Sequence, residues 1–254
     1  MPSSFHNLIE INIEKSDVGR TIIPSNELLQ LVKLQQITIE GPCEGLEEVF
    51  EVVEGSGSSE SRTLVPIPNL TQVKLKLLSN LKYLWKSNQW MVLEFSNLTT
   101  LSIEICHKLD HVFTCSMVRS LVQLQDLSIS YCHKITVIVK EEEEEWDAKV
   151  NEIMLPRLNS LKLQSLWKLK GFCLGKEAFS LPALDTLHIK ECRAITVFTK
   201  GNLSTPQLKV IHTHFGIYDA STDVNSFIET KPEVRINIIT YSSLLYKSIK
   251  GFII

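Results

Sequence analysis

A spaced hydrophobic pattern, L-x-x-L-x-L, recurs along most of the chain. Clear copies are LTTLSI at 98–103, LQDLSI at 124–129 and LDTLHI at 184–189. Within each copy, apolar and polar residues alternate with the period of two that is typical of a β-strand buried on one side. The copies predict a series of short strands, which begin at Leu8, Leu34, Leu70, Leu98, Leu124, Leu158, Leu184 and, in degraded form, Leu208.

The spacing of these strands indicates how the chain folds. Neighbouring copies begin 24 to 36 residues apart, so one unit buries only a few aliphatic side chains. Each buried side chain contributes roughly 1.5–3 kcal/mol, whereas ordering the backbone costs roughly 1–2 kcal/mol per residue. A single unit therefore cannot fold alone and must stack on its neighbours. We expect an α/β leucine-rich-repeat solenoid, with about eight repeats over residues 1–216.

The predicted solenoid has two different sides. A curved parallel β-sheet forms the concave face, and short helices or loops return over the convex face. Residues 25–31 and 116–121 are candidates for helical turns on the return path. Loop insertions near 51–66 and 140–154 account for the longest intervals: the first is rich in Gly and Ser and predicts a flexible loop. The second carries five consecutive glutamates, which favour a solvated loop, with an acidic docking element as the alternative.

Cys-His dipeptides at 106–107 and 132–133 are the strongest candidates for chemistry. They can be metal ligands, a cysteine nucleophile with its base, or one structural position that occurs twice. Each cysteine falls eight residues after the first leucine of its repeat, as Cys192 also does. The residue after Cys192 is Arg193, which cannot replace a zinc ligand. The sequence therefore favours the structural position, and it predicts no metal ligand, no cofactor and no catalytic residue.

The bulk composition narrows the classes of partner. A net charge of −3, with both signs interspersed, disfavours nucleic acid. No stretch approaches the roughly 18 apolar residues of a membrane span. The N-terminus has no signal-peptide pattern, so the six cysteines are expected to be free thiols in a reducing compartment. We expect a cytoplasmic protein whose partner is another protein.

The two ends of the chain differ from the repeats. Residues 217–254 form a non-repeat tail, which either covers the last repeat in part or is disordered. Solenoids require capping segments, and no polar segment precedes the first repeat at Phe5 to Leu8. We expect the chain to be a piece of something longer on its N-terminal side, or a truncated gene product.

Outward-facing strand positions form the candidate partner-binding surface. They lie side by side along the predicted sheet, roughly 4.8 Å apart. Their charge is acidic around a Lys74/Lys76 patch, neutral in the middle and basic or histidine-rich towards the C-terminus. Such a surface suits a protein of matching charge, although a merely solvated face is the alternative. The candidate residues are Lys74, Lys76, Ser102, Glu104, Ser128, Ser130, Lys162, Gln164, His188, Lys190, His212 and His214.

The units LTTLSIEICHKLDHVF, LQDLSISYCHKITVIV and LDTLHIKECRAITVF resemble the leucine-rich repeats of plant intracellular immune receptors. The resemblance covers residues 5–215 and is to the coiled-coil, nucleotide-binding class of disease-resistance proteins. It implies a non-catalytic domain that senses a pathogen effector or a guarded host protein and restrains the adjoining nucleotide-binding domain. The 254 residues contain neither a nucleotide-binding domain nor a coiled coil, so we expect no ATP hydrolysis from them.

A second function class, the substrate receptor of an F-box ubiquitin ligase, also uses cysteine-containing repeats. CHKIT at 132–136 and CRAIT at 192–196 are similar to the C-x-x-I-T-D units of those proteins. However, Val137 and Val197 stand where Asp should follow, and the sequence shows no F-box. The immune-receptor domain is therefore the leading hypothesis and the F-box receptor the alternative.

Overall fold

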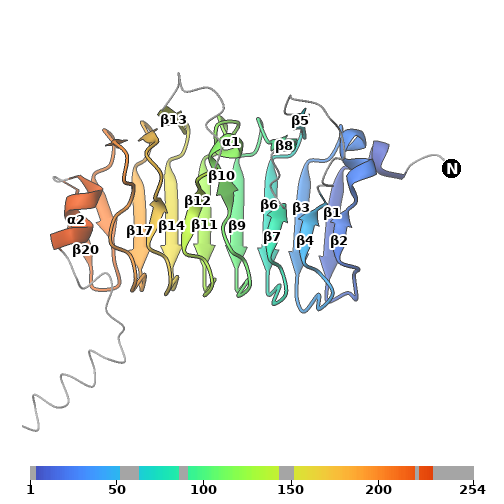
Figure 1. Ribbon diagram of the computed structural model, residues 1–254, viewed down its shortest axis with the longest axis horizontal. Helices are drawn as coiled ribbons and strands as arrows, with labels where there is room; N and C mark the ends of the chain where they lie inside the picture. The colour runs from blue at the N-terminus through green and yellow to red at the C-terminus, as the bar shows by residue number, and fades with distance from the viewer. Residues whose placement is uncertain (1–3, 52–62, 86–90, 143–151, 221–222, 231–254) are drawn as a thin grey trace, which may run out of the picture.

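A stack of coils runs from one end of the protein to the other in the computed structural model (Figure 1). The structure describes residues 4–51, 63–85, 91–142, 152–220 and 223–230. Residues 52–62, most of the glutamate run and the tail from 231 onward lie outside these ranges, so the loop predictions for them stay predictions. The last residues of both insertions belong to strands β5 (Thr63–Pro66) and β13 (Glu152–Met154).

A nine-stranded sheet forms one side of the stack. Eight of its strands are parallel and come from consecutive coils, which confirms the eight strands that the leucine pattern predicts. They are β1 (Glu10–Glu14), β3 (Gln36–Glu40), β6 (Gln72–Lys76), β9 (Thr100–Glu104), β11 (Asp126–Ser130), β14 (Ser160–Gln164), β17 (Thr186–Lys190) and β19 (Val210–His212). The shorter β19 corresponds to the degraded copy at Leu208.

The repeat leucines lie directly opposite one another in this sheet. Leu127 pairs in register with Leu101 on one side and Leu161 on the other. All three are at most 1% exposed, because their side chains point into the interior of the stack. Apolar rows that continue from coil to coil supply the core that a single unit cannot form. A second buried row contains Ile103, Ile129, Leu163 and Ile189.

The return side of the coils contains short strands more often than helices. These strands form four small parallel sheets. The first two consist of β2 (Thr21–Ile23), β4 (Glu48–Phe50) and β7 (Tyr83–Trp85), and of β5 and β8 (Met91–Glu94). The other two consist of β10 (Phe113–Thr114), β12 (Val137–Lys140) and β15 (Gly171–Cys173), and of β13, β16 (Ala178–Ser180) and β18 (Leu203–Ser204). The backbone N–H and C=O groups of such short strands form hydrogen bonds with neighbouring coils, whereas a helix of that length is unstable by itself.

Helical turns occur at only a few places in the described return path. Two of them, η2 (Ser25–Gln30) and α1 (Cys115–Val118), fall where the sequence predicts a helical turn. A third, η1 (Ser4–Asn7), precedes β1. The return side therefore contains the short helices and loops that the sequence predicts, together with short strands that it does not predict.

Each sheet strand that leads into a return segment ends in a left-handed turn. Positive φ angles occur at Lys15, Gly41, Leu77, Ile105, Tyr131, Ser165 and Glu191, which hold the same position in successive repeats. This conformation is unfavourable for a branched residue such as Ile105, whose φ is 57°. The turn is held because its N–H donates to the last carbonyl of the next strand: Ile105 to Ser130 and Tyr131 to Gln164, both at 3.0 Å.

The described part of the tail packs on the last coil. Strand β20 (Ile217–Asp219) pairs antiparallel with β19, and helix α2 (Val224–Thr230) follows it at the C-terminal end of the stack (Figure 1). The side chain of Asn225 accepts hydrogen bonds from the N–H groups of Phe198 (2.7 Å) and Thr199 (3.2 Å). Residues 217–220 and 223–230 therefore cover a strand edge that would otherwise be open; the domain boundary at 216 stays a prediction.

Replacing Leu161 with Ala should lower the free energy of unfolding by about 2–5 kcal/mol, because it leaves a cavity in the middle of a continuous apolar row. Urea unfolding followed by circular dichroism measures this change. Ser160→Ala, one residue earlier on the outward side of β14, is the matched control and should shift stability by about 0.5 kcal/mol or less. Equal effects of the two substitutions would contradict the stacked core.

Candidate functional site

The cysteines at the repeat position lie inside the strand-end turns. Cys106, Cys132 and Cys192 are completely buried. Each donates its S–H to the carbonyl oxygen two residues earlier in the chain, at 3.6, 3.3 and 3.5 Å respectively. The sulfur therefore satisfies a backbone carbonyl where the chain leaves the sheet, and this geometry supports the structural role that the spacing favours.

Two of these thiols, Cys106 and Cys192, are held in their protonated form. A hydrogen bond with Cys132, together with burial, raises the pKa of Cys106. Burial raises the pKa of Cys192 to about 12. Because the thiolate is the reactive form of cysteine, the two groups are poor nucleophiles at neutral pH.

The residues that follow the cysteine position form an exposed stack along one edge of the solenoid. We call His107, His133, Trp167 and Arg193 the edge stack. The ring centroids of His107 and His133 are 4.3 Å apart, and those of His133 and Trp167 are 4.2 Å apart. The guanidinium carbon of Arg193 lies 4.9 Å from the Trp167 ring centroid. The imidazoles thus pack face to face outside, while the neighbouring sulfurs lie inside.

Trp167 is the member of the edge stack that the sequence analysis missed. Leu166 replaces the cysteine in that repeat, so the cysteine-based pattern gives no sign of it. Counting nine residues from Leu158, the first leucine of the repeat, does place Trp167 at the position of the two histidines. Burial, together with the charge of His107, lowers the pKa of His133 within the stack.

The two outward columns predicted for the sheet lie in register. The first contains Asn12, Thr38, Lys74, Ser102, Ser128, Lys162, His188 and His212. The second contains Glu14, Glu40, Lys76, Glu104, Ser130, Gln164 and Lys190. Two candidates are placed differently: Ser130 is buried, and His214 follows the end of β19 at His212.

A third outward column completes this face and was not included in the sequence analysis. It precedes the first inward residue of each strand, so the same two-residue period finds it. Polar side chains dominate it, which extends the surface open to a partner. Its members are Glu10, Gln36, Gln72, Thr100, Asp126, Ser160 and Thr186.

Charges at the N-terminal half of the face are paired across neighbouring strands. Lys74 of β6 forms an ion pair with Glu40 of β3, and Lys76 pairs with Glu104 of β9 at 3.0 Å. A hydrogen bond from Lys74 holds the pKa of Glu40 below its usual value. Exposed pairs of this kind contribute little stability, but they neutralise the Lys74/Lys76 patch that the sequence suggests.

The C-terminal half of the face carries a basic patch, which we define as Lys162 and Lys190. Neither lysine forms an ion pair with any residue that the structure describes. Between them lies His188, whose ring stacks on His212 with centroids 4.3 Å apart. Burial, His212 and the two lysines lower the pKa of His188 to about 4. His188 is therefore neutral at pH 7, while the lysines carry the charge.

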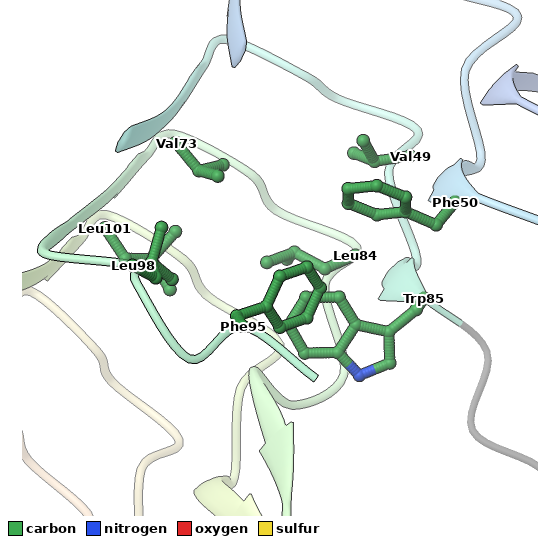
Figure 2. A pocket seen from close by; sticks show the side chains of 8 residues that line it. All are labelled: Val49, Phe50, Val73, Leu84, Trp85, Phe95, Leu98 and Leu101. Carbon is green, nitrogen blue, oxygen red and sulfur yellow. The ribbon is translucent and has the colours of Figure 1, made fainter. Parts of the chain in front are cut away.

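A small cavity inside the stack offers no chemistry of its own. Figure 2 shows the side chains that line it, and they are hydrophobic or aromatic: Val49, Phe50, Val73, Leu84, Trp85, Phe95, Leu98 and Leu101. The rings of Trp85 and Phe95 are 4.9 Å apart at their centroids, and Phe50 lies 5.7 Å from Phe95. This aromatic cluster joins coils through packing, and it presents no acid, base or nucleophile to a substrate.

Three features define a leucine-rich-repeat solenoid: in-register parallel strands, buried repeat leucines, and buried thiols in the strand-end turns of three repeats. The chain belongs to the plant disease resistance protein RPS2-like leucine-rich-repeat family, whose profile matches residues 1–133. Comparison with curated proteins found no match, and comparison with solved structures found none either. Within the described residues, no helix is long and apolar enough to cross a membrane.

The buried thiols should resist alkylation in the native protein. At pH 8, iodoacetamide should leave Cys106, Cys132 and Cys192 unmodified because all three are inaccessible, and the raised pKa values of Cys106 and Cys192 protect these two further. Peptide mass spectrometry before and after denaturation in urea measures the modification, and all three should react in the unfolded chain. Rapid native modification of Cys132 would rule out its place inside the turn.

His188 should titrate far below an ordinary histidine. Its ring proton resonances should shift near pH 4 in an NMR titration, and His212→Asn should raise this value by removing a stacked, titratable neighbour. Since the folded-state pKa lies below the ordinary value of 6.5, the unfolded chain binds more protons between these values. The folded state should therefore lose stability as the pH falls from 6.5 towards 4. A His188 pKa near 6.5 would show that the ring is open to solvent.

Proposed function

We propose that this chain is the non-catalytic sensing domain of a plant intracellular immune receptor and that it binds a protein through the face of its nine-stranded sheet. Family membership supports a resistance-related leucine-rich-repeat domain. The sheet face supports recognition, because its three outward columns present a continuous polar surface on a rigid scaffold. Binding sites on such scaffolds are set by side chains that the fold holds in fixed positions.

The distribution of unpaired charge carries this proposal. In the N-terminal half of the face, lysines are neutralised within the sheet by Glu40 and Glu104. In the C-terminal half, the basic patch projects from β14 and β17 beside a neutral His188. Electrostatic complementarity selects partners and speeds association. The partner surface that docks here is therefore acidic.

Three protein classes fit this surface within an immune receptor: a pathogen effector, a guarded host protein, and the nucleotide-binding domain of the same receptor. The first two make the chain a sensor, and the third makes it a restraint on signalling. All three place the chain in the cytoplasm and require no cofactor from it. A catalytic role has no support, since the buried cysteines are structural and the cavity is apolar.

Charge reversal on the basic patch tests the proposal. A display screen against secreted pathogen proteins, host proteins and nucleotide-binding domains first identifies a binder, and calorimetry then measures its affinity. Lys162→Glu with Lys190→Glu should weaken binding at least tenfold, about 1.4 kcal/mol, and should reduce the dependence of affinity on salt.

The matched control is Lys33→Glu with Lys200→Glu, two exposed lysines outside the sheet strands with the same change in net charge. It should leave the affinity within about twofold, which is below 0.5 kcal/mol. A binder that is lost with the control pair and kept with the patch pair would place recognition on another surface and overturn the proposal.

A further inference from the structure

Two cysteines outside the repeat position meet on the return side of the solenoid. Cys115 is the first residue of α1, Cys173 is the last residue of β15, and Glu177 follows in the loop before β16. The two sulfurs and a carboxylate oxygen of Glu177 all lie within 4.8 Å of one another. Strands β10, β12 and β15 of one small sheet bring these segments together, although they are far apart in the sequence.

These sulfurs differ in environment from the thiols at the repeat position. Both are buried, yet neither closes a strand-end turn of the main sheet. Cys115 donates its S–H to the Cys173 sulfur, and the backbone N–H of Gly175 donates to the same atom. The Cys173 thiol itself donates to a carboxylate oxygen of Glu177 at 3.9 Å. The donors from Cys115 and Gly175 lower the pKa of Cys173, whereas the bond between the two thiols and burial raise the pKa of Cys115. Donors directed at one sulfur stabilise a thiolate there.

Two carboxylates converge on the same place. A methyl group at Gly175 would lie 2.2 Å from a carboxylate oxygen of Glu177 and 3.2 Å from the carboxylate carbon of Glu141. The φ angle of Gly175 is not in the left-handed region, so the backbone conformation does not require glycine. What glycine provides is space for the carboxylates beside the thiols.

The resulting cluster holds acidic groups without a compensating cation. Neither Glu141 nor Glu177 forms an ion pair with any residue in the described ranges. Both carboxylates raise the cost of ionising Cys173, and Glu177 has the same effect on Cys115. Carboxylates beside two sulfurs offer the mixed sulfur and oxygen donor set that a cation such as zinc takes.

We propose that Cys115, Cys173 and Glu177 bind a zinc ion, with a water molecule as the fourth ligand. Zinc takes tetrahedral sets of sulfur, nitrogen and carboxylate oxygen, whereas thiolates are poor ligands for magnesium or calcium. On binding, the two thiols release their protons to solvent, and two sulfur–metal bonds replace two S–H bonds. The ion ties α1 to β15 and to the loop before β16, so it clamps the two coils on either side of the coil that contains β12, on the side opposite the recognition face.

Metal content of the purified full chain tests this site. The protein is prepared in reducing buffer, loaded with zinc, dialysed and measured by elemental mass spectrometry, and a chromogenic chelator then gives the affinity by competition. We expect one zinc per chain. Cys115→Ser and Cys173→Ser should each weaken binding at least about 100-fold, since loss of even an outer-shell partner costs about 10–100-fold. Cys132→Ser, at a buried repeat thiol, should retain the metal.

Two variants that should perturb the fold less test the same site if the cysteine variants misfold. Glu177→Gln preserves shape at a partly exposed position, and Gly175→Ala fills the space that the carboxylates occupy. Both should weaken zinc binding at least tenfold while circular dichroism stays unchanged. Their controls are Glu44→Gln and Gly19→Ala, the latter at a position where an added methyl group meets nothing within 4 Å.

Cobalt substitution provides an independent spectroscopic measure. The cobalt-loaded chain should show thiolate charge-transfer absorption and the intense visible bands of tetrahedral coordination, and Cys173→Ser should lose the charge-transfer absorption. The proposal is wrong if the wild-type chain takes up no zinc, if Cys115→Ser binds it equally well, or if the two cysteines form a disulfide in reducing buffer. None of these measurements involves a protein partner, so their outcome is separate from that of the proposed function.

Discussion

The hydrogen bond from each strand-end turn to the next coil is the constraint on which the rest of the structure depends. It places the left-handed residue, the last strand carbonyl and the buried thiol of one coil in fixed relation to those of the next. Once this relation is set, the leucines of consecutive strands must lie opposite one another. The continuous core, and not any single repeat, then balances the entropy of ordering the chain.

Such stacking has a chemical consequence, because it brings like residues from successive repeats into contact. His107 packs on His133 and His188 on His212, and the thiol of Cys106 meets that of Cys132. Like neighbours disfavour the charged state, which contributes to the lowered pKa values of His133 and His188 and to the raised pKa of Cys106. Where glutamate alternates with lysine, as from Lys76 to Glu104, the same spacing neutralises both groups. Net charge accumulates only where the alternation fails, as in the basic patch.

The sequence predicts those features that follow a fixed period. Strand positions, the outward columns and the structural role of Cys132 all follow from counting residues within a repeat. Counting residues does not predict the strands of the return side, because these short segments become strands only through pairing with neighbouring coils, as β10 does with β12. Pairing between Lys74 and Glu40 depends on rotamers, which a sequence does not reveal. The meeting of Cys115 with Cys173 depends on the lengths of two unrelated return segments.

The two sides of the solenoid are therefore under different physical restrictions. On the sheet side, every inward position must continue an apolar row, so function is confined to outward columns that repeat at the strand spacing. On the return side, each coil can take its own path, since β10, β12 and β15 require only two to four paired residues each. Non-repeating constellations such as two thiols beside two carboxylates can arise there without disturbing the core. The proposed recognition face and the proposed zinc site therefore use different residues, which the rigid core separates.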